Sequence, residues 1–344
     1  MRSTTHVTAL LACAVLAASC GTGESAVEYE LTGAAMGTRY SVKVAEPVPT
    51  EARERLAGGI EEVIDGIESR MSTYIVGSDV SRFNASRSTD WIEVSADVCD
   101  AVVASARLSE MTGGAFDITV GPLVNLWGFG PDTVELAPPP EEEVAAARAR
   151  VGWQRVHADC SKPALRKDRP DVYIDLSAWA KGYAVDRVGE LLEREGLRNY
   201  LVAIGGELRM RGRNARGELW SVAIEKPTDD GGTIEMVLAL TDSAASTSGD
   251  YRNYFVHEGR RYSHLIDGRE GRPVAHNLAS VTVIAERATF ADPMATALLV
   301  LGPEEGMALA TEQGIAALFQ QRTDEGFSEA MSPAFAELVA RQAR

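Results

Sequence analysis

Six strand-like segments follow one another between residues 200 and 285, with no helical pattern between them. Each is a short run of apolar or alternating residues bounded by glycine or polar turn residues, as is typical of β-strands. The segments are Tyr200–Ile204, Glu207–Gly212, Trp220–Ile224, Thr233–Leu240, Arg261–Ile266 and Leu278–Ala285. Strands grouped in this way beside groups of helices exclude an alternating βαβ array and predict an α+β fold.

Helical patterns occupy much of the chain on either side of these strands. In Thr50–Arg70 apolar residues recur at intervals of three and four positions, as on one face of a helix. The predicted helices are Thr50–Arg70, Ser95–Met111, Glu141–Val151, Ala180–Glu195, Pro293–Leu301, Glu304–Gln313 and Ser332–Ala343, with a helical turn over Ser78–Phe83. The other predicted strands are Val27–Leu31, Arg39–Val44, Val172–Leu176 and Ile315–Gln320. We find no internal repeat, so we expect residues 27–344 to form one domain.

The chain is strongly acidic. It has 50 Asp and Glu residues against 34 Lys and Arg residues, which gives a formal net charge of −16. A protein that binds nucleic acid usually presents a basic face to the phosphates. We therefore expect no nucleic-acid partner.

The N-terminal residues differ from the rest of the chain. Arg2 supplies a positive charge, Val7–Ala18 is almost wholly apolar, and Ala-Ala-Ser precedes Cys20. The apolar run is shorter than the roughly 20 residues of a spanning helix and is typical of an export signal. We predict that residues 1–19 are a lipoprotein signal peptide, that Cys20 carries lipid and that residues 20–26 are a tether. The protein is then exported and lipid-anchored to a membrane of the bacterial cell envelope; an ordinary cleaved signal is the alternative.

Two other cysteines remain once the signal is removed and Cys20 is lipidated. Cys99 and Cys160 can pair in an oxidising compartment, or both can be buried thiols, and the sequence leaves these alternatives open. The sequence has no CxxC motif and no His/Cys spacing of the kind that binds zinc.

Five clusters carry glycine or polar residues where a plain hydrophobic core does not need them. They are residues 113–121, residues 175–186, residues 204–212, residues 246–255 with 261–273, and residues 291–297. Paired glycines let backbone N–H groups approach a ligand, and a strand-to-helix junction is a common phosphate-binding geometry. Each cluster alone is also explained by a helix cap, a turn, a β-bulge or a structural histidine.

The last of these clusters contains a pair of oxygen ligands. Asp292 and Thr296 are four residues apart at the start of an apolar helix, so they share one face of it. A carboxylate and a hydroxyl are hard oxygen donors that suit Mg²⁺. A helix N-cap at Asp292, with Pro293 at the first helical position, explains the same residues and stays open.

Together, the clusters resemble the ApbE family, the FAD:protein FMN transferases, from about Ala34 to about Leu301. The motifs in chain order are MGTRYSV, MSTY, GGAFDITVGPL, DLSAWAKGYAVD, IGGELRMRG, STSGDYRNYF, SHLIDGREGRP and ADPMATALLVLG. The resemblance implies an α+β ApbE-like fold of mixed, mainly antiparallel sheets with flanking helices. It also implies that FAD binds between two lobes.

The same resemblance implies the residues of the site. The expected FAD contacts are Met36, Tyr74, Ala115, Phe116, Asp117, Lys181 and Ile266. The carbonyl of Ala178 and the side chains of Asp292 and Thr296 are expected to hold Mg²⁺. His264 and Asp175 are the expected catalytic residues beside the diphosphate, with His264 favoured for handling a proton.

The reaction that the resemblance implies is Mg²⁺-dependent. A Thr or Ser hydroxyl in a small-residue motif of an acceptor flavoprotein attacks the FMN-side phosphorus of FAD, and AMP leaves. Two alternatives remain: an FAD pyrophosphatase that uses water, and an FAD-binding lipoprotein without catalysis. The products distinguish them, as protein-linked FMN with AMP, free FMN with AMP, or unchanged FAD.

Overall fold

The computed structural model describes residues 29–131, 136–228 and 232–342. The predicted signal peptide, Cys20 and the tether lie outside the described residues. Within the described ranges, no helix combines the length and the apolar character that crossing a bilayer requires.

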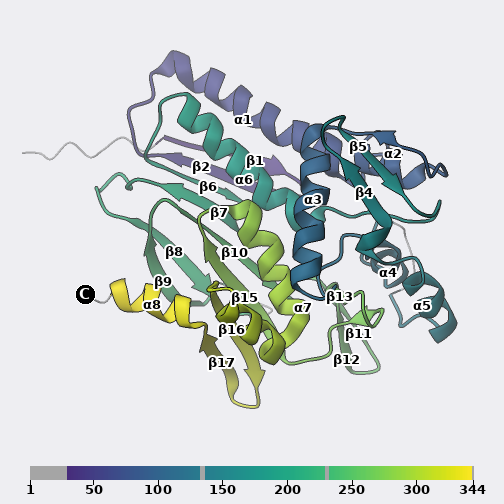
Figure 1. The fold of residues 1–344 in the computed structure, drawn as a ribbon. Helices are drawn as coiled ribbons and strands as arrows, with labels where there is room; N and C mark the ends of the chain where they lie inside the picture. Colours follow the sequence, from purple (N-terminus) through teal and green to yellow (C-terminus); the bar gives the residue numbers. More distant parts are fainter. Residues whose placement is uncertain (1–28, 132–135, 229–231, 343–344) are drawn as a thin grey trace, which may run out of the picture.

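An eight-stranded sheet forms the centre of the fold (Figure 1). Its spatial order is β1 (Tyr29–Ala35), β2 (Thr38–Val44), β6 (Tyr200–Ile204), β7 (Glu207–Arg211), β10 (Ser243–Gly249), β15 (Leu278–Ala285), β16 (Ala316–Thr323) and β17 (Gly326–Met331). Every neighbouring pair of strands in this sheet is antiparallel. Sequential hairpins and the distant pairing of β2 with β6 therefore build one sheet, and the α+β prediction is confirmed.

Helices cover one face of this sheet (Figure 1). They are α1 (Thr50–Met71), α6 (Ser177–Arg194) and α7 (Ala288–Glu312), with α3 (Ala96–Met111) beside α7. The main apolar core lies between these helices and the sheet, because successive strand residues point to opposite faces. In β16, Ala317 and Phe319 are buried in this core, whereas Leu318 belongs to a cluster on the other face.

A hairpin and a helix cover that other face. They are β8 (Trp220–Glu225) with β9 (Ile234–Leu240), and α8 (Pro333–Gln342). Trp220, Leu238 and Phe335 are buried here against Met210 of β7 and Leu318 of β16. The body of the protein is therefore a layer of helices, a sheet, and a layer formed by the hairpin and α8.

A smaller lobe has its own apolar cluster. It consists of α4 (Gly121–Leu126), α5 (Glu141–Arg148), β11 (Tyr254–His257), β12 (Arg260–Ser263), β13 (Ile266–Asp267) and β14 (Arg272–Pro273). Leu123 and Trp127 are buried together with Phe255 and Ile266. The indole N–H of Trp127 donates to the carbonyl of Gly271 at 3.1 Å, which ties the helical part of the lobe to its β part.

A disulfide joins α3 to a second small sheet. The elements there are α2 (Asp79–Ala85), β3 (Ile92–Glu93), η1 (Trp153–Arg155), β4 (Val156–Asp159) and β5 (Ala164–Lys167). Cys99 in the first turn of α3 is bonded to Cys160, which directly follows β4, and their Cα atoms are 5.7 Å apart. Of the two states that the sequence left open, the structure has the paired one.

The predicted strand Val172–Leu176 is wrong. Its residues alternate in burial as a strand does, but the segment belongs to no sheet of the described chain. The side chain of Asn84 instead accepts the N–H of Ile174 at 2.8 Å and donates to its carbonyl at 2.9 Å. The N–H of Asp175 donates to the carbonyl of Ile118 at 2.7 Å. These bonds satisfy the backbone where a strand would use a ladder.

Several other predicted boundaries differ from the structure, and three differ most. The predicted strand Val27–Leu31, whose first two residues lie outside the described ones, corresponds to β1, which extends to Ala35. The predicted helices Pro293–Leu301 and Glu304–Gln313 are parts of α7, which begins earlier, at Ala288. A kink at Gly302, with φ of 83°, separates the two parts, and glycine adopts that angle without steric cost. The predicted strand Arg261–Ile266 is divided between β12 and β13.

Candidate active site

A cavity of about 700 Å³ lies where the sheet, the starts of α6 and α7, and the smaller lobe meet. All the predicted FAD, magnesium and catalytic residues except Met36 line it. They are Tyr74, Ala115, Phe116, Asp117, Asp175, Ala178, Lys181, His264, Ile266, Asp292 and Thr296. The structure therefore brings together residues that lie more than two hundred positions apart in the sequence, while their individual roles stay predictions.

Met36 lies outside the cavity wall. It occupies the turn between β1 and β2 with a positive φ of 51°. Its N–H donates to Oε2 of Glu68 on α1 at 3.2 Å, and its side chain packs against the main core. The structure thus places Met36 beside α1 and does not bring it to the other predicted FAD contacts.

Lys181 contacts two buried carboxylates at the base of the cavity. Its Nζ is paired with Oε1 of Glu207 and lies 3.9 Å from Oδ1 of Asp292. Burial alone lowers the pKa of Lys181, but the two carboxylates outweigh it and raise that pKa overall. Burial raises the pKa of the Asp292 carboxyl, and the charge of Lys181 opposes that shift. The pKa of Asp292 is raised to about 7, with Glu207 adding to the effect of burial, and a cation bound beside this carboxyl would favour its ionised form.

Glu207 is a site residue that the sequence interpretation did not assign. It is 3% exposed, and its Oε2 has no hydrogen-bond partner among the described residues. The sequence signal was an acidic residue directly after Gly205 and Gly206, at the start of an otherwise ordinary strand. Its pairing with Lys181 depends on α6 crossing the start of β7, which sequence spacing does not reveal.

The residues predicted to hold Mg²⁺ fit that ion. Oδ2 of Asp292 accepts the N–H of Gly182 at 2.8 Å. In a regular helix that N–H serves the carbonyl of Ala178, four residues earlier, so Asp292 competes for the donor of this carbonyl. Oγ1 of Thr296 lies 2.8 Å from Oγ of Ser248. A carboxylate, a hydroxyl and a carbonyl are hard oxygen ligands, and Mg²⁺ completes such sets with water or substrate phosphates.

The described part of the chain has no group of three or more His, Cys, Asp or Glu residues arranged around a metal position. The oxygen set at the start of α7 includes only one carboxylate, from Asp292. Such a set suits a site whose remaining ligands come from a substrate, and it does not resemble a closed structural metal site.

Both carboxylate oxygens of Asp117 accept hydrogen bonds from neighbouring residues of the protein. Its Oδ1 accepts the N–H and the hydroxyl of Thr119, at 2.7 and 2.6 Å, and its Oδ2 accepts the N–H of Trp153 at 2.9 Å. Thr119 in turn accepts the N–H of Gly152 at 2.7 Å. Burial raises the pKa of this carboxyl, although the bonds from Thr119 and Trp153 oppose the shift. Asp117 thus braces the glycine-rich wall of the cavity against the segment before η1.

His264 has a defined tautomer in this geometry. Its Nδ1 lies 3.1 Å from the carbonyl oxygen of Asn253, so Nδ1 carries the hydrogen and Nε2 carries the free lone pair. Phe129 contacts the ring edge-on, with centroids 6.3 Å apart. Burial lowers the pKa of His264, which keeps the imidazole neutral near pH 7. A neutral imidazole in a cavity is a suitable proton acceptor.

Asp175 lies at the start of α6, near Tyr74. Its Oδ1 accepts the N–H of Ser177 at 2.8 Å, which satisfies one of the first helical donors. Partial burial raises the pKa of Tyr74, although much of the side chain is exposed, and the charge of Asp175 raises it further. The structure therefore places Asp175 in the cavity wall, with one carboxylate oxygen bonded to the start of α6.

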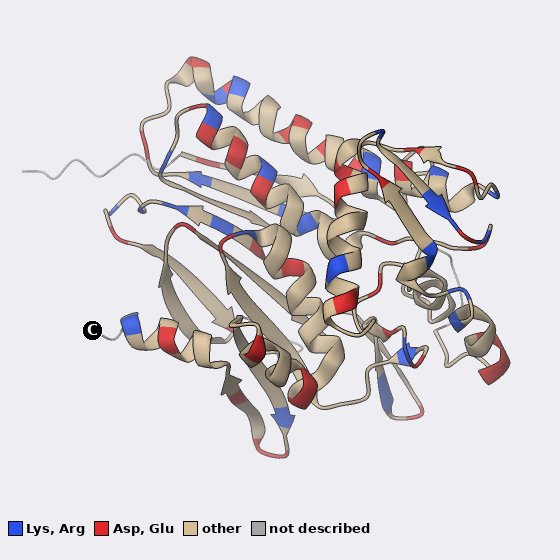
Figure 2. Cartoon of the chain, viewed as in Figure 1, with Lys and Arg blue, Asp and Glu red and all other residues tan. Residues whose placement is uncertain are grey.

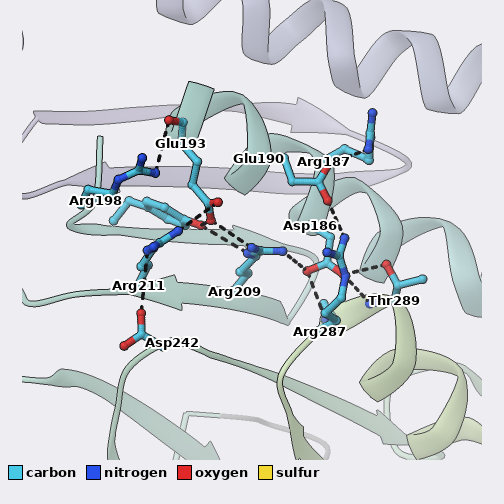
Figure 3. A network of polar contacts seen from close by, with 12 residues as sticks. Asp186, Arg187, Glu190, Glu193, Arg198, Arg209, Arg211, Asp242, Arg287 and Thr289 are labelled. Carbon is cyan, nitrogen blue, oxygen red and sulfur yellow. Dashed lines mark hydrogen bonds and ion pairs between the residues drawn. The ribbon is translucent and has the colours of Figure 1, made fainter. Parts of the chain in front are cut away.

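A network of charged residues lies behind the cavity. Lys, Arg, Asp and Glu residues are interspersed along α6 and the neighbouring strands (Figure 2), and Figure 3 shows their contacts. Asp186 of α6 is fully buried and accepts Nη1 of Arg209 at 2.9 Å. It also accepts the N–H and the hydroxyl of Thr289, at 2.9 and 2.6 Å, and the N–H of Ala288 at 3.2 Å. Asp186 thus caps α7, whose own N-cap residue, Arg287, makes no side-chain cap bond.

Comparisons with known proteins agree with this arrangement. The sequence profile of the ApbE family matches residues 36–319. The chain is 41% identical to an FAD:protein FMN transferase of Vibrio cholerae over 332 residues, which are 96% of this chain and 99% of the relative. It is 43% identical to an FAD:protein FMN transferase of Salmonella typhimurium over 307 residues, with 89% and 87% covered.

Two solved structures resemble the whole fold. The flavin transferase ApbE from Vibrio cholerae superimposes with a TM-score of 0.84 at 40% identity, covering 90% of this chain and 99% of that one. The apo form of the flavinyl transferase ApbE from Pseudomonas stutzeri gives a TM-score of 0.83 at 41% identity, with 91% and 96% covered. The likeness therefore extends over both lobes and the cavity between them.

Proposed function

Because the chain belongs to the ApbE family and transfers FMN from FAD to an acceptor protein, we propose that the cavity is where this transfer takes place, and that it requires Mg²⁺. The acceptor group is a Thr or Ser hydroxyl in a small-residue motif of a flavoprotein subunit, and AMP is released. The observation that carries this proposal is the convergence of His264, Lys181 and the oxygen ligands Asp292 and Thr296 on one cavity.

The base of the cavity is suited to the diphosphate of FAD. Asp292, Thr296 and the carbonyl of Ala178 would hold Mg²⁺, which when bound neutralises the diphosphate and stabilises the departing AMP oxygens. Lys181 adds a positive charge beside them, held in place by Glu207. Phosphoryl-type transfer depends mainly on positioning and charge stabilisation, which these buried groups supply without large rearrangement.

His264 is the proposed base for the acceptor hydroxyl. Its Nδ1–H donates a hydrogen bond to the carbonyl of Asn253, which leaves Nε2 free to accept a proton. Nε2 takes the proton of the hydroxyl as the hydroxyl oxygen forms its bond to the FMN-side phosphorus. The bond from that phosphorus to the AMP oxygen breaks, and AMP leaves with the electron pair. Proton transfer of this kind contributes about 10²–10⁴-fold to the rate. Asp175 positions the start of α6 through its bond from the N–H of Ser177.

The direct test is intact-mass measurement of an acceptor subunit incubated with the enzyme, FAD and Mg²⁺. We expect the acceptor to gain the mass of one FMN group while one AMP is released for each group transferred. An acceptor in which the target Thr is replaced by Val should stay unmodified. Release of free FMN with an unmodified acceptor would instead identify a pyrophosphatase, and unchanged FAD would identify a binding protein.

We also propose that the protein is exported and lipid-anchored through Cys20, with residues 1–19 removed and residues 20–26 as tether. The sequence before Cys20 supports this, and the disulfide between Cys99 and Cys160 suits an oxidising compartment. Cys20→Ser should release the protein from the membrane fraction or leave it uncleaved. Normal processing and membrane retention of that variant would contradict the anchor.

A further inference from the structure

Three consecutive apolar side chains are exposed in the loop between α1 and α2. Tyr74 is 66% exposed, Ile75 39% and Val76 90%. Among the exposed large apolar side chains of the described residues, no other three are adjacent in sequence. Isolated apolar residues are normal on a surface, but a contiguous group beside a functional site usually marks a contact with another molecule. We call residues 72–77 the rim loop.

Hydrogen bonds fix the rim loop at both ends. The buried hydroxyl of Ser78 donates to the carbonyl of Ser72 at 2.6 Å, and the N–H of Ser78 donates to the carbonyl of Ile75 at 3.0 Å. The N–H of Tyr74 donates to Oγ of Ser72 at 3.1 Å. The loop is therefore preorganised, so a partner that contacts Val76 does not have to order it first.

The rim loop is continuous with the cavity. Thr73 and Tyr74 line the cavity wall, whereas Val76 lies two residues further on and is not part of that wall. Any polypeptide that brings a hydroxyl to the cavity must pass its mouth. A small-residue motif around that hydroxyl lets the backbone enter but buries little apolar area. The apolar contacts that hold the acceptor must then be made outside the cavity, beside its mouth.

We propose that the rim loop is the docking site for the acceptor protein. An apolar side chain of the acceptor, close in sequence to its Thr or Ser, covers Ile75 and Val76 while the hydroxyl enters the cavity. This inference rests on the proposed function, because it assumes that a protein hydroxyl is the nucleophile. It adds a contact that selects acceptors by their apolar flanking residues.

The test compares Val76→Asp with the wild-type full-length enzyme in detergent solution. The probe is a flavoprotein subunit that gains one FMN group with the wild-type enzyme. We expect KM for this subunit to rise about tenfold or more, because the buried apolar contact is lost and a charge is left in its place. The Kd for FAD should be unchanged, since Val76 is not in the cavity wall. Val76→Ile, which keeps an apolar side chain, should have the wild-type KM.

The matched control is Ala340→Asp, which places the same charge at an exposed position of α8, an element that contributes nothing to the cavity wall. It should leave KM unchanged. A wild-type KM for Val76→Asp would overturn the docking site while transfer itself continued. A weaker Kd for FAD with an unchanged KM would assign the loop to the flavin, and slowing only in lipid vesicles would assign it to the membrane. Failure of the wild-type enzyme to modify any acceptor would instead contradict the proposed function.

Discussion

Lys181 is the residue around which charge is concentrated in the cavity. It lies between Glu207 and Asp292, both at most 3% exposed. A buried carboxylate that loses its partner is strongly destabilised, because desolvation is no longer offset by attraction. The groups at the base of the cavity therefore act as a unit, and substitution of one changes the state of the others.

Substitutions of the two proposed side-chain ligands should differ in severity, because Asp292 carries a charge and Thr296 does not. Asp292→Ala removes both a ligand and a negative charge, so we expect transfer to be abolished and Mg²⁺ affinity to be lost. Thr296→Ala removes a neutral oxygen, and raised Mg²⁺ should partly rescue it. Calorimetric titration of Mg²⁺ in the presence of ADP checks both. Asp292 lies inside α7 and is not its N-cap, so the cap alternative from the sequence is wrong. A purely structural role, as acceptor of the Gly182 N–H, predicts instead a stability loss of about 1–3 kcal/mol with nearly normal turnover.

The pH dependence of the transfer rate should follow the protonation of His264. Burial lowers its pKa from the usual 6.5, and the neutral form accepts the proton, so activity should persist at pH values below 6.5 before it declines. His264→Gln should lower turnover by about 10²–10⁴-fold and remove this acid limb. The Kd for FAD, measured by flavin fluorescence, should stay close to the wild-type value. Normal turnover in the variant would place His264 among the structural residues.

Asp117 should act through the shape of the cavity wall. In Asp117→Ala, the buried N–H of Thr119 and the partly buried N–H of Trp153 lose their acceptor. Each unsatisfied buried donor costs about 1–3 kcal/mol, so we expect a clear loss in the free energy of unfolding, measured by urea denaturation. FAD binding should weaken with it. A variant that binds FAD poorly but unfolds like the wild type would show instead that the carboxylate contacts FAD directly.

At the scale of elements, α7 depends on α6 for its start. Asp186 caps α7 through Ala288 and Thr289, only a few residues before Asp292 (Figure 3). Two buried carboxylates therefore join the helices that supply Lys181, Asp292 and Thr296: Asp186 of α6, and Asp292 of α7 through the N–H of Gly182. The carboxylate of Asp186 also forms an ion pair with Arg209 of β7, which connects the sheet to the start of α7.

Asp186→Ala should consequently be more damaging than the loss of an ordinary cap. It removes the cap and one of the two carboxylates that contact Arg209, the other being Glu193, so we expect a destabilisation of about 2–3 kcal/mol. The exposed pair of Arg216 and Glu218 supplies the control, because Glu218→Ala should change stability by about 1 kcal/mol or less. Thermal unfolding of both variants measures the difference. Equal effects of the two substitutions would contradict the capping role.

The elements that the sequence predicted best are those whose pattern matches their burial. Tyr200–Ile204 and Leu278–Ala285 are strands at the predicted bounds, because apolar β-branched and aromatic residues face the core. Ser243–Gly249 is a central strand that was not predicted. Its small residues have weak strand propensity, and the pairing with β7 and β15 determines its conformation.

The sequence predicted those site residues that lie in the family motifs. The resemblance supplied residues such as Lys181 and Asp292, which the structure brings to one cavity. Glu207 and Asp186 were not found, because their partners come from other elements and only the folded chain places them together. Met36 follows the motif order, but the turn that contains it points its backbone toward α1.

At the scale of the whole molecule, the disulfide closes a loop of 61 residues between α3 and the second small sheet. Limiting the unfolded chain in this way stabilises the native state by about 4 kcal/mol in the chain-entropy account. Cys99→Ala combined with Cys160→Ala should therefore lower the melting temperature, and reductant should lower it only in the wild type. Identical melting of the wild type and the double variant would show that the bond contributes nothing.

The long helix α1 separates the start of β1 from the rim loop. The start of β1 pairs with the end of β2, and α1 begins soon after, at Thr50. Its 22 residues extend about 33 Å before the rim loop begins. If the lipid anchor proposed at Cys20 is present, the proposed docking site in the rim loop therefore lies at the far end of a rigid helix from the strand that the anchor precedes. Such an arrangement would favour targets whose hydroxyl projects well above the bilayer over targets that lie flat against it.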